Sequence, residues 1–384
     1  MFHQNVLRFA RTRPLDSPAA LCELAATPTS DRATVALRLA SSDNHMKAIF
    51  WGTCALAIIS GCGDSEDEQT ETESSRSGAP SVLVDLDPDS TGMSVTVESI
   101  TASSRGLLFT SDRESGDVLR IDPQSPAPVV VGRLQDRTDA AGAPQKANGA
   151  GLVFTPAGDL LIASGAFNEI LRLQAAELTA ATPAVAQTFI TGVNGANSVL
   201  LEGDDLFVSG GATGNVYRAP ASGGAAEVWA RIEPTSRSVP PDNFMQAVVA
   251  NGLAREPGGA LLVADTARAA IWRIPVNADG SAGTPEVTAQ SSSLEGVDGL
   301  SYDPRGRLWG AVNERNALVV VDGGVVTDVY KNDNAGPLEF PAALVFVGNQ
   351  GFVVNFDRAR ADNFADDGTT SSAGIGASIA QFAL

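Results

Sequence analysis

The chain has 384 residues, of which 43% are hydrophobic, 38 are glycine and 21 are proline, a composition typical of a folded protein rich in turns. Its net charge of −19 argues against a nucleic-acid-binding protein, because binding to phosphates needs basic faces. The same acidity is compatible with the binding of cations.

The beginning of the chain divides at Met46. Residues 1–45 show no sustained hydrophobic periodicity, and we interpret them as an upstream extension that precedes the true start of translation. Residues 46–61 begin with Met46 and Lys47 and continue with an apolar run, a pattern typical of a secretory signal. The ending Ile-Ser-Gly-Cys resembles the lipobox of bacterial lipoproteins, in which the cysteine, here Cys62, is lipidated. The alternative is a buried helix with an incidental cysteine.

Cleavage before Cys62 would remove both histidines and the other two cysteines of the chain. The remaining protein could then have no Ser-His-Asp or Cys-His catalytic site, no zinc site built on His or Cys, and no disulfide. Any metal would have to be held by oxygen atoms, which favours a hard cation such as calcium or magnesium.

Residues 62–80 are polar and strongly acidic and cannot bury enough apolar surface to fold. We expect them to be a tether between a lipid-anchored Cys62 and the domain that follows. Asp64 is the third residue of this tether rather than the second, so the sequence shows no clear inner-membrane retention signal. The predicted location is the bacterial cell envelope, at the outer membrane facing the periplasm.

From residue 82 onward, short apolar runs alternate with turn residues and no long helical pattern appears, which predicts an all-β structure. Residues 251–274 (NGLAREPGGALLVADTARAAIWRI) show the repeating unit most clearly. A polar residue leads into an apolar strand, a Pro-Gly-Gly turn follows, and two further strands come after it. A fourth apolar run follows several of the units.

The spacing of this unit places its leading residue six times along the chain. Consecutive leading residues are 52, 47, 54, 47 and 44 residues apart. Four strands in a repeat of this length is the period of a β-propeller. The leading positions are Glu98, Ala150, Asn197, Asn251, Asp298 and Ala342.

Residues 81–384 are therefore predicted to form a six-bladed β-propeller with four-stranded antiparallel blades. The sixth blade has only two clear strands of its own, so we expect residues 378–382 to supply its third strand and residues 81–86 its fourth. This pairing of N- and C-terminal strands would close the ring and leave no unpaired edge. A pair of β-sandwiches is the competing architecture, but it explains neither the period nor the leading residues.

The six leading residues should meet around one mouth of the central channel, because equivalent positions of a propeller form a ring. Four of them, Glu98, Asn197, Asn251 and Asp298, carry side-chain oxygens that would be poorly satisfied unless a cation lay among them. Two carboxylates, two amide oxygens and waters make a reasonable shell for Ca²⁺ or another divalent hard cation. Taken singly, Asn-Gly and Asp-Gly are also common turn residues before strands.

Four short motifs stand at these positions, namely Glu98-Ser99-Ile100, Asn197-Ser198-Val199, Asn251-Gly252-Leu253 and Asp298-Gly299-Leu300. In this order and at this spacing they resemble the metal-bearing motifs of the senescence marker protein/gluconolactonase/luciferin-regenerating enzyme family. The members of that family are six-bladed propellers, and many are metal-dependent lactonases or related esterases.

The resemblance implies that Glu98, Asn197, Asn251 and Asp298 bind the ion. It also implies that Asp298 is the general base, or the nucleophile as in esterase-like members. Two departures bear on the substrate. Gly195-Ala196 stand where sugar-lactonase members have an arginine, and the cleaved chain has no histidine near the metal.

Long connections between blades are expected on the side of the ring. Residues 232–248 join blades three and four, where Phe244 with Met245 would form an apolar wall and Arg237 or Asp242 a polar contact to substrate. A solvated loop is an equally open interpretation of this segment. On the connection into the second blade, Asn148, with Lys146 nearby, is a further predicted substrate contact. Asp112 and Asp265, which end second strands, are expected to be structural.

Together these features predict a lipid-anchored, extracytoplasmic, calcium-dependent hydrolase of a lactone or related ester, acting as a monomer without nucleic acid. The alternative is a non-catalytic propeller that binds a protein, glycan or small molecule and uses the ion for structure. The two hypotheses differ in the effect of Asp298→Ala. Turnover would be lost in the first, and only the melting temperature would change in the second.

Overall fold

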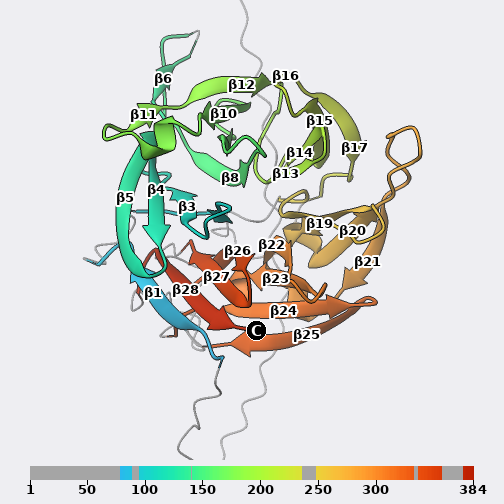
Figure 1. The fold of residues 1–384 in the computed structure, drawn as a ribbon. Coiled ribbons are helices and arrows are strands. Elements are labelled where there is room, and N and C mark those ends of the chain that lie inside the picture. Colours follow the sequence, from blue (N-terminus) through green and yellow to red (C-terminus); the bar gives the residue numbers. More distant parts are fainter. Residues whose placement is uncertain (1–77, 89–94, 140, 236–247, 333–335, 357–374) are drawn as a thin grey trace, which may run out of the picture. The chain divides into compact units, whose positions relative to one another are not determined.

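The computed structural model describes residues 78–88, 95–139, 141–235, 248–332, 336–356 and 375–384. All described residues belong to one compact unit, Glu71–Leu384. Six small sheets are arranged as a ring in this unit (Figure 1), which confirms the predicted six-bladed β-propeller. Among the described residues, no helix has the length and apolar character needed to span a membrane.

Each blade is built on four antiparallel strands, which lie side by side in chain order from the centre of the propeller to its outer edge. The innermost strands of blades one to six are β2 (Thr101–Ala102), β8 (Gly149–Phe154), β13 (Val199–Glu202), β18 (Leu253–Arg255), β22 (Val297–Tyr302) and β26 (Pro341–Val347). The second strands are β3 (Leu108–Ser111), β9 (Leu160–Ser164), β14 (Asp205–Ser209), β19 (Leu261–Asp265), β23 (Leu308–Val312) and β27 (Gln350–Asn355).

The outer half of each blade follows the same order. The third strands are β4 (Asp117–Asp122), β10 (Glu169–Leu173), β15 (Asn215–Pro220), β20 (Ala270–Ile274), β24 (Ala317–Asp322) and β28 (Ser378–Ala383). The outermost strands are β5 (Ser125–Arg133), β12 (Gln187–Thr191), β17 (Glu227–Arg231), β21 (Glu286–Gln290), β25 (Val325–Lys331) and β1 (Ser81–Asp85). Three-residue 3-10 helices are η1 (Glu177–Thr179), η3 (Thr266–Arg268), η4 (Ser292–Leu294) and η5 (Asn313–Arg315).

The two ends of the propeller meet in one sheet, as predicted. Strand β1 pairs antiparallel with β28, with Ser81 opposite Gln381 and Asp85 opposite Ser378. The sixth blade therefore takes three strands from the end of the chain and its outermost strand from the beginning (Figure 1). Neighbouring innermost strands contact one another around the whole ring, including β26 with β2.

Two short strands join neighbouring blades. Strand β11 (Ala184–Val185) precedes the outermost strand of blade two but pairs in parallel with β5 of blade one. Strand β16 (Gly224–Ala225) precedes the outermost strand of blade three and pairs in parallel with β12 of blade two. A separate hairpin, β6 (Arg137–Thr138) with β7 (Pro144–Gln145), lies in the connection between the first two blades.

The hydrophobic core consists of six clusters, and each lies between two adjacent blades. In β9, Leu160 and Ile162 join the cluster shared with blade one, whereas Leu161 and Ala163 join the cluster shared with blade three. Alternate side chains of one strand thus enter different clusters, because successive residues point to opposite faces of a sheet. Both faces of the second strands are buried, which explains why their sequences are mostly apolar.

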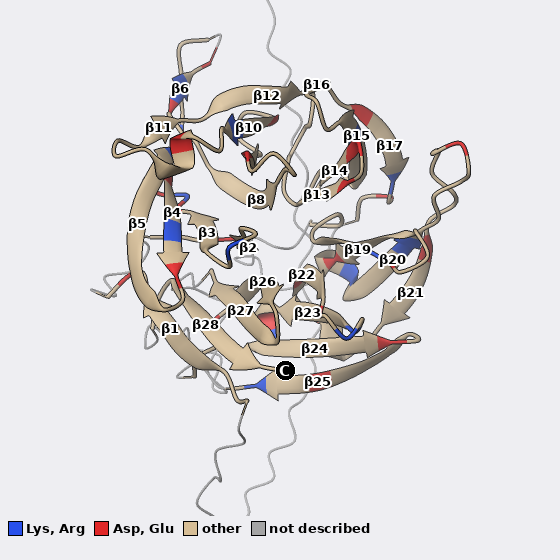
Figure 2. Cartoon of the chain, in the orientation of Figure 1, with Lys and Arg blue, Asp and Glu red and all other residues tan. Residues whose placement is uncertain are grey.

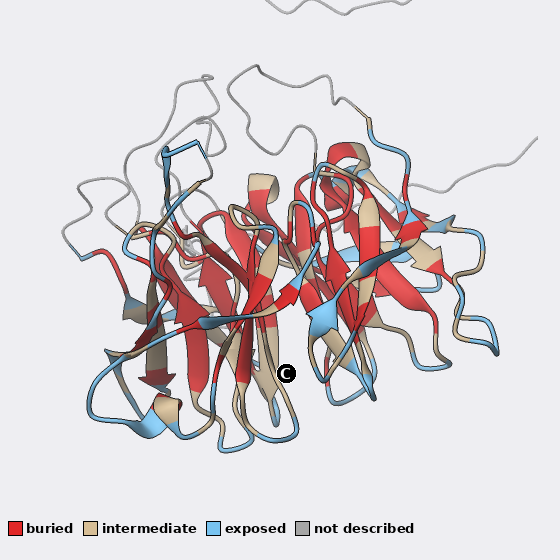
Figure 3. Ribbon diagram, turned by 90° about the horizontal axis from the view of Figure 1, so that it is seen from above, coloured by how far each residue is buried: buried red, intermediate tan, exposed pale blue. Residues whose placement is uncertain are grey.

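Burial decreases toward the turns and the outermost strands. Figure 3 shows buried residues along the strands inside the blades and exposed residues in the loops and turns. Figure 2 shows the charged residues scattered over strand ends, loops and outer strands. Outermost strands carry exposed valines such as Val325, with 66% of its surface accessible, and Val228, with 56%.

Candidate functional site

The leading residues of neighbouring blades lie at the same level of the ring. The Gly151 amide, next to the leading Ala150, donates a 2.7 Å hydrogen bond to the carbonyl oxygen of Asn197. The Gly252 amide, next to Asn251, donates a 3.1 Å hydrogen bond to the carbonyl oxygen of Asp298. Glycine is required at both positions, because a Cβ atom would lie 2.6 Å from the Asn197 oxygen and 2.1 Å from the Asp298 oxygen.

Glu98 and Asn197 contact each other across the ring. Asn197 Nδ2 donates a 2.9 Å hydrogen bond to Glu98 Oε1, although the two residues are 99 positions apart in the chain. The leading residue of blade two, between them, is Ala150. Its side chain is too small to separate the polar side chains of blades one and three. The repeat register therefore brings together two residues that no local motif connects.

Asn251 and Asp298 form the other half of the site and are almost completely buried, with 1% and 6% of their surfaces accessible. Asn251 Nδ2 donates a 3.0 Å hydrogen bond to Thr266 Oγ1, which in turn donates to the carbonyl oxygen of Val297. Asn313 Nδ2 donates a 3.3 Å hydrogen bond to Asp298 Oδ2. Both side chains are held by residues that follow the second strand of their own blade.

The electrostatic environment of Asp298 is unfavourable for a charge. Burial raises the pKa of its carboxyl group from 3.8 to about 8. Three smaller effects lower this pKa, namely the hydrogen bond from Asn313, the positive charge of Arg113 and a hydrogen bond from the Asn251 side chain. A carboxyl group this deeply buried is stabilised in its charged form only if a further cation comes close.

Two amide oxygen atoms of the site accept no hydrogen bond from the described residues. They are Asn251 Oδ1 and Asn313 Oδ1, and each is inaccessible to solvent. Buried polar atoms without partners are rare and require an explanation. No three His, Cys, Asp or Glu side chains of the described residues come together, so a cation here would depend on amide oxygens as well as on two carboxylates. Such a donor set fits a hard divalent cation.

Arg113 and Asn313 belong to the site but were not predicted from the sequence. The guanidinium of Arg113 forms an ion pair with Glu98 Oε2 and lies 5.8 Å from the centre of the Phe356 ring. Arg113 and Asn313 each stand fifteen residues after the leading residue of their blade, as Thr266 does after Asn251. In an antiparallel blade the end of the second strand lies beside the start of the first, so this spacing was a signal that the sequence already contained.

The remaining predicted site residues do not join this cluster or lie outside the described residues. Asn148 Oδ1 accepts a 2.9 Å hydrogen bond from the Ala166 amide and so holds the turn after β9. Its role in substrate binding stays a prediction. Arg237, Phe244 and Cys62 lie outside the described residues.

The two aspartates at the ends of second strands are structural, as expected. Asp112 accepts hydrogen bonds from the amides of Thr96, Glu114 and Ser115. Asp265 accepts from the amide and the guanidinium of Arg268 and from the Trp272 indole. Both carboxylates fasten the turn that follows them, and neither has an oxygen without a hydrogen-bond partner among the described residues.

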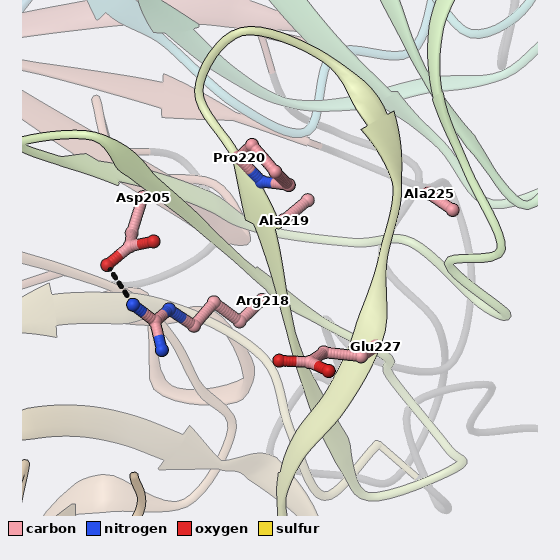
Figure 4. Close-up of a pocket in the computed structure, with 6 residues that line it drawn as sticks. All are labelled: Asp205, Arg218, Ala219, Pro220, Ala225 and Glu227. Carbon is pink, nitrogen blue, oxygen red and sulfur yellow. Dashed lines mark hydrogen bonds and ion pairs between the residues drawn. The ribbon is translucent and has the colours of Figure 1, made fainter. Parts of the chain in front are cut away.

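Two cavities lie away from the ring. One of about 360 Å³ is lined by β14, β15 and β17, and Figure 4 shows its Arg218 directed toward Asp205, with which it forms a 2.6 Å ion pair. The other, of about 390 Å³, lies between blades four and five, with Glu256 and Tyr302 in its wall. Neither cavity is lined by a leading residue, so neither enlarges the candidate site.

Three solved structures illustrate the similarity of the fold. Each is matched over 80% of this chain. They are a luciferin-regenerating enzyme (12% identity, 95% of that chain, TM-score 0.57), a gluconolactonase from Xanthomonas campestris (16%, 89%, 0.55) and a calcium-binding protein, regucalcin, from Agrobacterium tumefaciens (16%, 95%, 0.54). At these identities the likeness shows the fold alone. No curated protein sequence matches the chain.

A match to a family of sequences goes further than the structural likeness. Residues 96–351 match the model described as the SMP-30/Gluconolactonase/LRE-like region. The match covers well over half of the chain and contains Glu98, Asn197, Asn251 and Asp298. With the six-bladed fold and this ring of oxygen donors in place, the chain belongs to the SMP-30/gluconolactonase/LRE-like family.

Proposed function

We propose that this protein is a hydrolase of a lactone or related ester and depends on Ca²⁺ or another divalent hard cation. The observation that carries the proposal is the ring of oxygen donors, Glu98, Asn197, Asn251 and Asp298, of which the last two are almost completely buried. Asn251 Oδ1 accepts no hydrogen bond from the described residues, and the Asp298 carboxyl group has a pKa of about 8. Membership of the family and the likeness to a gluconolactonase and to a calcium-binding regucalcin support it.

In this proposal the four leading residues would hold the cation. When bound, it would polarise the carbonyl group of the substrate and stabilise the negative charge that develops on its oxygen. Asp298 would take a proton from the attacking water. The ester oxygen of the lactone would receive a proton as its bond to the carbonyl carbon breaks, and the product would be a hydroxy acid. Asn313, whose Nδ2 donates to Asp298 Oδ2, would orient the carboxylate for this step.

Substrate contacts are proposed at the connections that border the ring. Asn148 stands on the connection into blade two, where its side chain is half-buried. Arg237 and Phe244 belong to the connection between blades three and four, and the sequence favours a polar and an apolar contact there. The substrate would be a small lactone or ester rather than a polymer or a nucleic acid.

The test is hydrolysis of a panel of lactones and esters by purified protein, with Ca²⁺ and with a chelator. Turnover of at least one lactone that is lost with chelator and in Asp298→Ala would support the proposal. Asp265→Ala is a matched control, because it removes a buried aspartate of the neighbouring blade that does not belong to the ring. Absence of hydrolysis by folded, calcium-loaded protein would refute the enzymatic function.

We also propose that the protein is a lipid-anchored monomer of the bacterial cell envelope, attached to the outer membrane through Cys62 and facing the periplasm. The pattern of residues 46–62 supports this proposal. In metabolic labelling, a radioactive fatty acid should be incorporated into the wild-type protein and not into Cys62→Ser. Equal labelling of both proteins would refute the anchor.

A second candidate function is a non-catalytic propeller that binds a partner and uses the ion, if any, for structure. The ion pair between Arg113 and Glu98 favours it, because an arginine already neutralises one of the two carboxylates. In that case Ca²⁺ would raise the melting temperature, and no member of the lactone panel would be hydrolysed.

A further inference from the structure

The blades of this propeller share one arrangement at the ring. In blades four and five, the leading residue is contacted by the side chain fifteen positions later, Thr266 on Asn251 and Asn313 on Asp298. These two partners are neutral. In blade one the residue at the same position is Arg113, and its guanidinium forms an ion pair with Glu98. The site therefore contains a built-in positive charge at one of three equivalent positions.

The backbone of Arg113 is held beside Glu98 by several hydrogen bonds. Its amide donates a 2.8 Å hydrogen bond to the Thr96 carbonyl, and Asp112 Oδ1 accepts a 2.9 Å hydrogen bond from the Thr96 amide. The turn that follows is closed by the Gly116 amide, which donates to the Asp112 carbonyl. The segment that leads to Glu98 and the turn that carries Arg113 are thus joined into one hydrogen-bonded unit.

The guanidinium is partly exposed. The side chain of Arg113 is 25% accessible, whereas that of Glu98 is 13% accessible. On one side the guanidinium lies over the Phe356 ring of blade six. A contact between a cation and an aromatic face at a partly exposed position is weak.

A divalent cation and Arg113 would compete for the same carboxylate. Glu98 Oε2 is inaccessible to solvent and is paired with the Arg113 guanidinium, and a cation held by Glu98 would need this carboxylate. Two positive charges beside this partly buried carboxylate would repel each other. Since Arg113 also acts electrostatically on Asp298, its departure would affect both carboxylates of the ring.

We propose that Arg113 is the internal counter-ion of the metal-free site and that a divalent cation must displace its guanidinium from Glu98 in order to bind. This inference rests on the proposed metal site. It makes Arg113 a residue that sets the affinity for the cation: the arginine stabilises the empty ring, and each cation that binds must first replace it. An ordinary ligand-orienting residue would have the opposite effect, because its removal would weaken binding of the cation.

The test is isothermal titration of chelator-treated protein with calcium chloride. Arg113→Gln should bind calcium at least ten-fold more tightly than the wild type, and addition of Glu98→Gln should abolish this gain. Arg315→Gln is the matched control, because Arg315 also follows a second strand, is 20% accessible and forms a 2.8 Å ion pair with Asp328. This control should bind calcium as the wild type does.

A second measurement uses the wild-type chain and does not depend on the folding of a variant. The Nε–Hε resonance of Arg113, assigned by comparison with Arg113→Lys, should shift in a ¹⁵N NMR spectrum when calcium is added. An unchanged resonance, or equal or weaker calcium binding by Arg113→Gln, would overturn the inference while leaving the metal site in place. If calcium binds to Arg113→Gln but not to the wild type, the result would support the inference and refute metal dependence of the native protein. If calcium binds to neither protein, the result would refute both the inference and the proposed metal site.

Discussion

Replacement of Asp298 by asparagine should stabilise the metal-free protein, and the effect can be calculated from its environment. The folded carboxyl has a pKa of about 8 and the unperturbed one a pKa of 3.8. At pH 7 the folded protein therefore keeps a proton that the unfolded chain has lost. Above the unfolded-state pKa of 3.8, each pH unit costs the folded protein about 1.4 kcal/mol of stability. From pH 3.8 to pH 7, roughly three pH units, the cost is about 4 kcal/mol.

The sign follows from the direction of the shift. Because the folded-state pKa is raised, the contribution of Asp298 to stability is fully present below pH 3.8 and is lost as the pH rises to about 8. An asparagine side chain at this position would have a similar shape and no titrating group. The stability of Asp298→Asn should therefore not fall in this way as the pH rises. At roughly 2 °C per kcal/mol for a domain of this size, its melting temperature in chelator at pH 7 should exceed that of the wild type by about 8 °C.

The assay is thermal unfolding of both proteins in chelator between pH 5 and 8. The difference between the two curves isolates Asp298 from the other titrating groups, and it should widen by about 1.4 kcal/mol per pH unit. Calcium should then stabilise the wild type and leave the variant almost unchanged. Parallel pH profiles of the two proteins would refute the assigned environment of Asp298.

Three further predictions concern the neighbours of the ring. Asn313→Leu removes a hydrogen bond that lowers the pKa of Asp298, so the pH-dependent loss of stability in chelator should extend to higher pH than in the wild type, as measured by the same unfolding assay. Asp265→Ala leaves the Arg268 and Trp272 donors unpaired and should cost roughly 2–4 kcal/mol in urea unfolding, while the rise in melting temperature caused by calcium stays unchanged. Gly252→Ala places a Cβ atom 2.1 Å from the Asp298 carbonyl oxygen and should displace the backbone of Asp298, so calcium binding measured by titration should weaken at least ten-fold. An unaltered affinity would show that the backbone can move to accommodate the methyl group without harm to the site.

The sequence predicted those parts of the fold that repeat. Leading residues, second strands and third strands recur at one spacing, and the closure of the ring by β1 and β28 followed because the sixth blade lacked two strands. The parallel strands β11 and β16 were not predicted, since two-residue backbone pairings leave no hydrophobic pattern. Their residues read as ordinary connections.

The same distinction applies to the site. Glu98 and Asn197 could be placed in contact because equivalent positions of a repeat must meet around an axis. Arg113 could not be recognised from its surroundings, since Asp112, Arg113 and the residues after them read as a turn. Its ion pair with Glu98 arises because the end of the second strand lies beside the start of the first. The fifteen-residue spacing between the two residues indicates this proximity, whereas composition and local motifs do not.

The pairing of β1 with β28 has a consequence for biosynthesis. Strand β1 is the first strand of the propeller to be made and its partner β28 is the last, so the ring stays open until β28 has been synthesised. Until then β1 has no partner and β27 has an unpaired edge, which are features that chaperones and proteases recognise in incomplete proteins. A chain that stops before Ser378 lacks the whole of β28 and cannot close the ring through β1. The architecture thus separates finished from unfinished molecules before any substrate is met.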